Sequence, residues 1–145
     1  MVLYLDICCL KRPFDDQAQP RIRLESEAVL GLLVADASRV TFVRSAAHDL
    51  ENDQNPLVWR AERVRAWLAD QPLAATDAEP LRFRTRELID SGLAGFDALH
   101  LACAEGCGAD VLVTCDDRLL AVARRLGPAI KVRVGELIAI AREVL

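Results

Sequence analysis

Four acidic residues stand at positions where a carboxylate could do chemistry rather than simply face solvent: Asp6, Glu51, Asp97 and Asp116. The first ends an otherwise apolar N-terminal run, and the last comes soon after a second apolar run. Hard carboxylate oxygens without convergent His or Cys ligands favour Mg²⁺ or Mn²⁺ over zinc. Because close like charges are costly unless something positive lies between them, convergence of the four predicts such a cation site.

Each of the four carboxylates also has a simpler interpretation. Asp97 and Asp116 are suited to cap helix N-termini, a position that aspartate fills well. Asp6 could end a strand in solvent, and Glu51 could be a solvated helix residue. The coincidence of all four favours the functional interpretation, because Asp6 follows a wholly apolar strand and Asp97 interrupts an Ala-rich apolar stretch.

The second and fourth acidic positions have close competitors. Asp49 and Asp53 flank Glu51 in the sequence, so either could take its place. Asp117 either supplements Asp116 or only starts the helix that follows. These alternatives stay open at the level of the sequence.

The five cysteines predict reduced, buried thiols rather than a disulfide framework or a zinc centre. Their number is odd and no C-x-x-C pair occurs; they are Cys8, Cys9, Cys103, Cys107 and Cys115. We expect Cys8 and Cys9 to point to opposite sides of a strand. A zinc site of His100, Cys103 and Cys107 is the alternative, but it lacks a fourth ligand and the usual spacing. His100 follows Asp97 by three residues and either packs in the core or faces the same cleft.

The carboxylates converge only if the surrounding elements form a parallel sheet. Short β-prone runs at residues 2–5, 40–43, 111–113 and 131–134 alternate with helical patterns at residues 22–33, 46–51, 55–69, 76–89, 96–107, 117–126 and 135–145. Ser45 is suited to cap the second helix, and Asn55 followed by Pro56 is a typical helix start. This alternation predicts a single α/β domain, residues 1–145, with a mainly parallel central sheet and helices on both faces. Sites in such sheets form beyond the carboxyl ends of the strands.

Composition bounds the classes of protein that need be considered. The chain has 145 residues, is 52% hydrophobic and 28% charged, and carries a net charge of −4. These values exclude disorder and a membrane span, and the N-terminus lacks a signal peptide, so we expect a cytoplasmic protein. Binding to a phosphate backbone needs local basic clusters, for which the candidates are Lys11, Arg12, Arg21, Arg23, Arg118, Arg124, Arg125, Lys131, Arg133 and Arg142.

Three sequence blocks together resemble PIN-domain nucleases, including the ribonuclease toxins of VapBC-type toxin–antitoxin pairs. The blocks are VLYLD at 2–6, FDALHLA at 96–102 and VLVTCD at 111–116. The resemblance implies a three-layer α/β/α sandwich and hydrolysis of RNA phosphodiesters with one or two Mg²⁺ or Mn²⁺ ions. It also implies a homodimer and an antitoxin protein as partner. The family's acidic ligand and catalytic positions fall on Asp6, Glu51, Asp97 and Asp116.

Departures from the family pattern keep two other functions open. The family commonly has a small hydroxyl residue and Asn after the first Asp, where this chain has Ile7 and Cys8. Reduced polar support for Asp6 would suit a catalytically weak PIN-fold binding module. A phosphoacceptor or phosphatase domain using Asp6 is the third candidate, although Lys131 begins a strand and is poorly placed as its basic partner.

Overall fold

Four short parallel strands form the central sheet of the computed structural model, which describes all 145 residues. The spatial order is β2-β1-β3-β4, with bounds β1 Val2–Leu5, β2 Thr41–Phe42, β3 Val111–Thr114 and β4 Arg133–Glu136. Every neighbouring pair is parallel, as the alternation of strands and helices predicted. The sheet registers Leu5 against Val113, so β1 and β3 end side by side.

Alternate residues of the two central strands face two separate cores. Leu3 and Leu5 of β1 pack into one core, and Tyr4 packs into the other. All four residues of β3 are buried, with Leu112 on the same side as Tyr4. Burial on both faces explains why these strands are continuous apolar runs rather than alternating ones.

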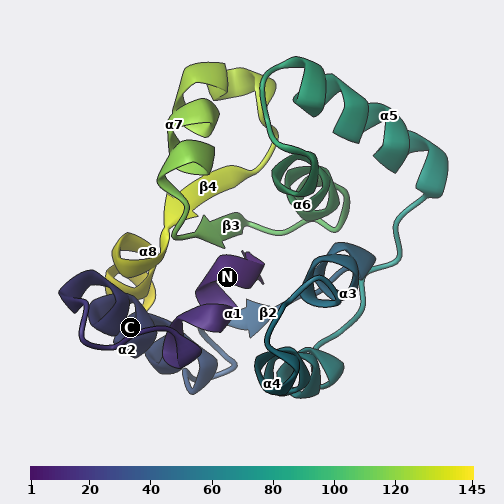
Figure 1. Ribbon diagram of the computed structural model, residues 1–145. Helices are drawn as coiled ribbons and strands as arrows, with labels where there is room; N and C mark the ends of the chain where they lie inside the picture. The colour runs from purple at the N-terminus through teal and green to yellow at the C-terminus, as the bar shows by residue number, and fades with distance from the viewer.

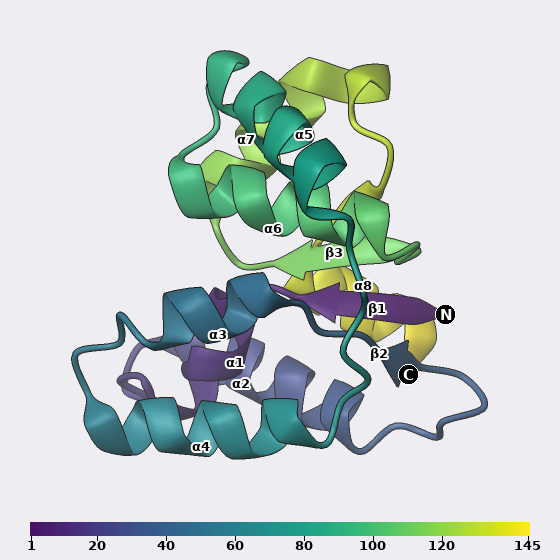
Figure 2. The same ribbon diagram turned by 90° about the vertical axis from the view of Figure 1, so that its right-hand side faces the viewer.

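Helices cover both faces and complete the predicted three-layer α/β/α sandwich. One core lies against α1 Ile7–Lys11, α2 Pro20–Leu33, α4 Val58–Ala69 and α8 Leu137–Val144, and the other against α3 Ala46–Asn52, α5 Ala78–Asp90, α6 Gly95–Gly106 and α7 Asp117–Leu126. Figure 2 shows α5, α6 and α7 on one side of β1 and β3, and α2 and α4 on the other. None of the helices combines the length and apolarity needed to cross a bilayer.

The main difference from the predicted elements lies directly after β1. Residues Ile7–Lys11 form helix α1, where no helix was predicted, and a 3₁₀ turn follows at Arg12–Phe14. The prediction that Cys8 and Cys9 point to opposite sides of a strand is therefore wrong. Consecutive residues of a helix are about 100° apart around its axis, so both thiols can face the end of β3.

Two smaller differences concern where elements start. Helix α4 begins after Leu57, so the predicted cap residue Asn55 lies two residues before the N-cap. Its side-chain oxygen accepts hydrogen bonds from Leu57 N and from the Arg60 side chain. Strand β4 starts at Arg133, two residues later than the alternation indicated.

The carboxyl ends of the strands form one rim, which Figure 1 views end-on. Asp6 N donates to Val113 O at 2.9 Å, which extends the pairing of β1 and β3 to the rim. The residues that follow β1 and β3 are thereby held next to each other. This edge of the sheet positions the candidate site.

Candidate metal and catalytic site

Asp6 is a buried carboxylate with an unusual environment. Its side chain is held at the end of β1 with 5% exposure, and no lysine or arginine forms an ion pair with it. Thr114 Oγ1 donates to Asp6 Oδ2 at 2.6 Å and Cys8 Sγ donates to the same oxygen at 3.1 Å. Burial and the Cys8 side chain raise the pKa of Asp6 well above its usual range, against a lowering effect of His100 and Thr114. A nearby cation would offset the cost of this buried charge.

Helix α3 brings Glu51 to the same point. Ser45 caps the helix and forms a reciprocal capping box with His48, which fixes the helix start as the sequence indicated. His100 Nε2 lies 2.6 Å from Glu51 Oε2, and one ligand atom each from Asp6, Glu51 and His100 lie within 4.8 Å of one another. Burial alone would raise the pKa of Glu51, but the hydrogen bond and charge of His100, with Lys11, lower it.

A buried polar network holds the imidazole of His100 in place. Tyr4 Oη lies 2.7 Å from His100 Nδ1 and 2.7 Å from Ser45 Oγ, which accepts a hydrogen bond from Ala47 N. When the Tyr4 hydroxyl donates to Nδ1, the Nε2–H of His100 donates to Glu51 Oε2. The network therefore fixes the ring and orients one oxygen of the Glu51 carboxylate, leaving Oε1 free.

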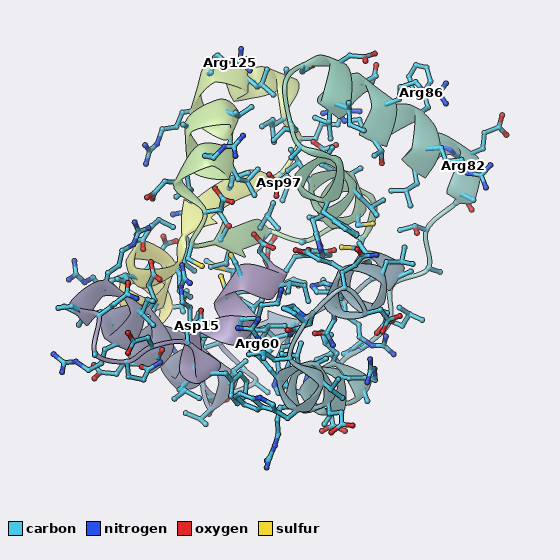
Figure 3. The ribbon with its side chains drawn as sticks, viewed as in Figure 1. Asp15, Arg60, Arg82, Arg86, Asp97 and Arg125 are labelled. Carbon is cyan, nitrogen blue, oxygen red and sulfur yellow. The ribbon has the colours of Figure 1, made fainter.

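Asp97 lies in the first turn of α6 and does not cap that helix. The N-cap is Ala94, and the half-buried Asp97 side chain makes no hydrogen bond within the protein. Burial, followed by the charges of Asp116 and Glu51, raises its pKa. The simple N-cap interpretation of Asp97 is therefore wrong, and its carboxylate lies close enough to Asp116 and Glu51 for their charges to act on it. Figure 3 labels Asp97 near the start of α6.

Asp116 combines a structural role with proximity to Asp97. It is the N-cap of α7, and its Oδ1 accepts hydrogen bonds from Arg118 N at 2.7 Å and Leu119 N at 3.1 Å. Its other carboxylate oxygen makes no hydrogen bond. Asp97 and Asp116 lie outside the tight group of Asp6, Glu51 and His100, so the rim carries one compact trio with two further carboxylates beside it.

The competing acidic residues are engaged elsewhere. Each forms an ion pair at 3.0 Å or less, the pairs being Asp49 with Arg44, Asp53 with Arg65 and Asp117 with Arg21. Arginine side chains therefore hold all three competitors, whereas Glu51 contacts His100 and Asp116 has no ion-pair partner, so we keep Glu51 and Asp116 as the candidates.

The alternative zinc site of His100, Cys103 and Cys107 does not assemble. Both ring nitrogens of His100 face Tyr4 and Glu51, and Cys107 Sγ donates to Ala104 O. His100 is both a buried helix residue and a member of the rim cluster, so the two interpretations of this residue are compatible.

Sequence reasoning missed the hydrogen-bonded groups behind the carboxylates. Thr114 supplies a hydroxyl to Asp6, which corrects the expectation that Ile7 and Cys8 leave this carboxylate with little polar support. The signal for Thr114 was its place at the end of β3, two residues before Asp116. Nothing in the local sequence links Tyr4 or Ser45 to His100, because the hydrogen bonds from Ser45 to Tyr4 and from Tyr4 to His100 depend on how β1, α3 and α6 pack together.

The donor set fits a hard divalent cation. Three carboxylates, those of Asp6, Asp97 and Asp116, have no lysine or arginine ion-pair partner, and two of them have a pKa raised by burial and by neighbouring groups. Carboxylate oxygens are the ligands that Mg²⁺ and Mn²⁺ prefer. A cation held among them would relieve the repulsion between them.

The buried imidazole of His48 predicts acid sensitivity of the fold. His48 Nδ1 accepts from Ser45 N and its Nε2–H donates to Leu5 O, so the ring is held neutral, and burial followed by His100 lowers its pKa to about 3. In the unfolded chain, His48 takes up a proton near its ordinary pKa of about 6.5. The free energy of unfolding should therefore rise as the pH increases from about 3 to about 6.5. The slope is at most about 1.4 kcal/mol per pH unit for one proton.

Urea unfolding between these pH values measures this slope, with His48→Gln as the comparison. The variant should be less stable at neutral pH but should lose about one proton's worth of pH dependence. An unchanged slope in His48→Gln would show that the dependence comes from other groups.

The fold and the rim together define a three-layer α/β/α domain with an acidic cluster at the carboxyl ends of its parallel strands. One solved structure with this fold is that of VapBC2 from Rickettsia felis bound to a DNA fragment from their promoter. The two chains superpose with a TM-score of 0.54 over 94% of this chain and 98% of that one, at 15% sequence identity. No family model matches the sequence, and no curated protein is significantly similar to it.

Proposed function

We propose that this protein is a metal-dependent ribonuclease that hydrolyses RNA phosphodiester bonds at the rim cluster. The observation that carries the proposal is the compact group of Asp6, Glu51 and His100, with Asp97 and Asp116 beside it. Its place beyond the carboxyl ends of parallel strands is where α/β sheets form their sites. The fold shared with the VapBC2 structure supports the proposal.

In this mechanism the protein holds the cation and the substrate and orients water. When bound there, Mg²⁺ or Mn²⁺ would supply a lowered pKa of the attacking water and neutralisation of charge on the phosphoryl oxygens. Asp6, Asp97 and Asp116 are the main ligands, and Thr114 fixes the orientation of the first. Glu51 completes the ligand set or orients the attacking water through Oε1, because His100 engages Oε2.

Two basic side chains next to the cluster, those of Lys11 and Arg118, are suited to contact the RNA backbone. Lys11 lies close enough to lower the pKa of Glu51, although burial opposes this effect, and Arg118 lines a small pocket with Asp97. Neither forms an ion pair, whereas three other basic candidates do, namely Arg12, Arg21 and Arg133. Phosphate contacts give affinity without sequence choice, so Lys11 and Arg118 would position the strand.

Arg118→Ala is expected to weaken RNA binding uniformly across sequences. Loss of one phosphate contact should lower the slope of log affinity against log salt by about 1. Arg86→Ala is the matched control, since Arg86 is an exposed, unpaired arginine on α5 that points away from Asp97 (Figure 3). Fluorescence anisotropy measures the RNA affinity of both variants, each made in a catalytically inactive protein so that the RNA stays intact. Equal effects of Arg118→Ala and Arg86→Ala on affinity would contradict the role of Arg118.

The experiment that tests the proposed activity is a cleavage assay with a mixed-sequence RNA. The full chain should cleave with Mn²⁺ or Mg²⁺, and EDTA or Asp6→Asn should abolish cleavage. Glu62→Gln, which changes an exposed and unpaired carboxylate on α4, should cleave like the wild type. Cleavage that survives EDTA, or that is equal in Asp6→Asn, would contradict the proposal.

The two other functions receive less support. Lys131 precedes β4 and so lies at the amino ends of the strands, away from Asp6, which removes the basic partner that a phosphoacceptor needs. Hydrogen bonds from Thr114 and Cys8 support Asp6, which weakens the argument for an inactive binding module. A metal-dependent nuclease remains the function that the geometry favours.

We further propose that the protein is the toxin of a toxin–antitoxin pair and pairs with an antitoxin protein. The support is the shared fold with a chain of the VapBC2 structure, in which the proteins are bound to a DNA fragment from their promoter. A neighbouring reading frame whose product binds this chain and suppresses RNA cleavage would be the expected finding. A product that binds without affecting cleavage would count against the toxin role.

We expect a homodimer in solution. Exposed apolar side chains gather where α4 begins, with Val58 70% and Trp59 52% exposed, and such clusters mark association surfaces. Sedimentation should give twice the 16.0 kDa chain mass, shifting toward the monomer in Trp59→Ala. A single 16.0 kDa species of the wild type at working concentration would exclude the dimer.

A further inference from the structure

We propose that Cys8, Cys9 and Cys115 form a thiolate site for Zn²⁺ beside the carboxylate cluster, with no ligand in common with it. Their three sulfur atoms lie within 4.8 Å of one another, and none takes part in a disulfide. With Zn–S bonds of about 2.3 Å, sulfurs around a tetrahedral zinc are roughly 3.8 Å apart. The thiols therefore need to close by only about 1 Å to bind the cation.

The cluster follows from the way in which β1 and β3 end. Helix α1 starts directly after Asp6 and turns Cys8 and Cys9 toward the end of β3, which Cys115 follows at once. Cys115 N donates to Cys8 Sγ at 3.3 Å, and Cys9 Sγ donates to Val113 O at 3.4 Å. Both thiols of α1 are thus fixed against the same backbone segment, so the ligand positions are largely formed before a cation binds.

A surface pocket gives a cation access to this cluster. The pocket encloses about 470 Å³, and its lining includes Cys8 and Cys115, the basic residues Arg12 and Arg21, and the carboxylates of Asp116 and Asp117. Cys9 and Cys115 are buried and Cys8 is half-buried, so entry is from the Cys8 side. This side leaves a fourth coordination position for water, as in zinc sites with three protein ligands.

The charges of the pocket do not oppose a cation. Glu25 is fully buried and pairs with both arginines of the pocket, and Arg21 also pairs with Asp117 at 2.6 Å. Their positive charge is therefore already compensated. Soft thiolate sulfur selects Zn²⁺ over Mg²⁺ and Mn²⁺, so the two proposed sites would not compete for the same ions.

The thiol cluster also borders the carboxylate cluster. Cys8 Sγ donates to Asp6 Oδ2 at 3.1 Å, so a cation bound by Cys8 would remove that hydrogen bond. The zinc site does not depend on nuclease activity, and its occupancy can be measured without RNA.

Titration of the reduced full chain with Cd²⁺ tests the site. A thiolate-to-cadmium charge-transfer band should saturate at one ion per chain, and Zn²⁺ should displace it while excess Mg²⁺ should not. Cys8→Ser and Cys115→Ser should lose at least about tenfold in affinity, since even indirect partners of metal ligands cost 10–100-fold. Cys107→Ser is the matched control, because Cys107 is a half-buried free thiol at the C-cap of α6, outside the cluster.

The control variants keep the outcomes distinct. In Cys8→Ser the serine hydroxyl keeps a hydrogen-bond donor toward Asp6, and a circular dichroism spectrum checks that this variant is folded. Cys9→Ser removes another of the three ligands and so provides a second test of the site. Asp97→Asn should bind Cd²⁺ like the wild type, so loss of the nuclease would leave the zinc site intact. Absence of the band, failure of Zn²⁺ to displace Cd²⁺, or equal titrations of the wild type and folded Cys8→Ser would overturn the proposal.

Discussion

Asp97→Asn is expected to abolish metal-dependent RNA cleavage while leaving the fold at least as stable as the wild type. The rate should fall by at least about 100-fold, because residues that only support metal ligands already cost 10–100-fold. The carboxylate makes no hydrogen bond in the protein, so the isosteric amide removes charge without breaking a contact. Initial rates at saturating Mn²⁺ measure the effect.

The stability side of this prediction follows from the pKa of Asp97. Burial, Asp116 and Glu51 raise that pKa, so the folded protein binds a proton at Asp97 more tightly than the unfolded chain does. This tighter proton binding adds to the free energy of unfolding. The contribution is complete at pH values below the pKa of Asp97 in the unfolded chain, and it is lost as the pH rises through the pKa in the folded state. At neutral pH the charged Asp97 is therefore a cost that asparagine removes, although weaker interaction with the α6 dipole offsets part of the gain.

Asp90→Asn is the matched control for this substitution. Asp90 is exposed at the end of α5 and forms no ion pair, so its loss should leave both cleavage and stability unchanged. Full activity of folded Asp97→Asn would remove this residue from the catalytic site. A large loss of stability would instead assign it a structural role.

Mn²⁺ is expected to stabilise the wild-type fold strongly. A cation that binds only the folded state contributes about 2.7 kcal/mol at a hundredfold excess over Kd. The thermal midpoint should then rise by several degrees, at about 2–4 °C per kcal/mol for a chain near this size. The physical reason is relief of repulsion among Asp6, Asp97 and Asp116, none of which is paired with a basic side chain.

The response to Mn²⁺ should be specific to the rim. Asp6→Asn and Asp97→Asn should each lose most of the rise, whereas Glu62→Gln should keep it. Cys107→Ser should keep it as well, because that thiol lies outside both clusters. An equal rise in all variants would mean that Mn²⁺ binds elsewhere on the surface.

The placement of the acidic residues was accessible from sequence because it depends on strand ends. In a parallel sheet, two apolar runs that are each followed by an aspartate predict that both aspartates lie at the same rim, and the structure places Asp6 and Asp116 there, on paired strands. The helix carrying Glu51 was also predictable, since Ser45 is a strong N-cap and forms the cap observed. Local signals of this kind need no knowledge of tertiary packing.

Contacts between distant elements could not be predicted in the same way. The hydrogen bond from His100 to Glu51 joins residues 49 apart in sequence and depends on how α3 packs against α6. The contact between Cys8 and Cys115 depends on α1, a five-residue helix. This helix has no acidic residue in its first turn and no side-chain cap from which it could be predicted. Such a short helix is stabilised mainly by packing of its apolar side chains rather than by its own propensity.

Anomalous X-ray scattering from crystals grown in Mn²⁺ tests the central claim most directly, because it locates the cation without reference to activity. The account predicts a peak coordinated by Asp6 and by at least one of Glu51, Asp97 and Asp116. A peak only at other residues, or none at the rim at saturating Mn²⁺, would contradict the assignment of this cluster as a metal site.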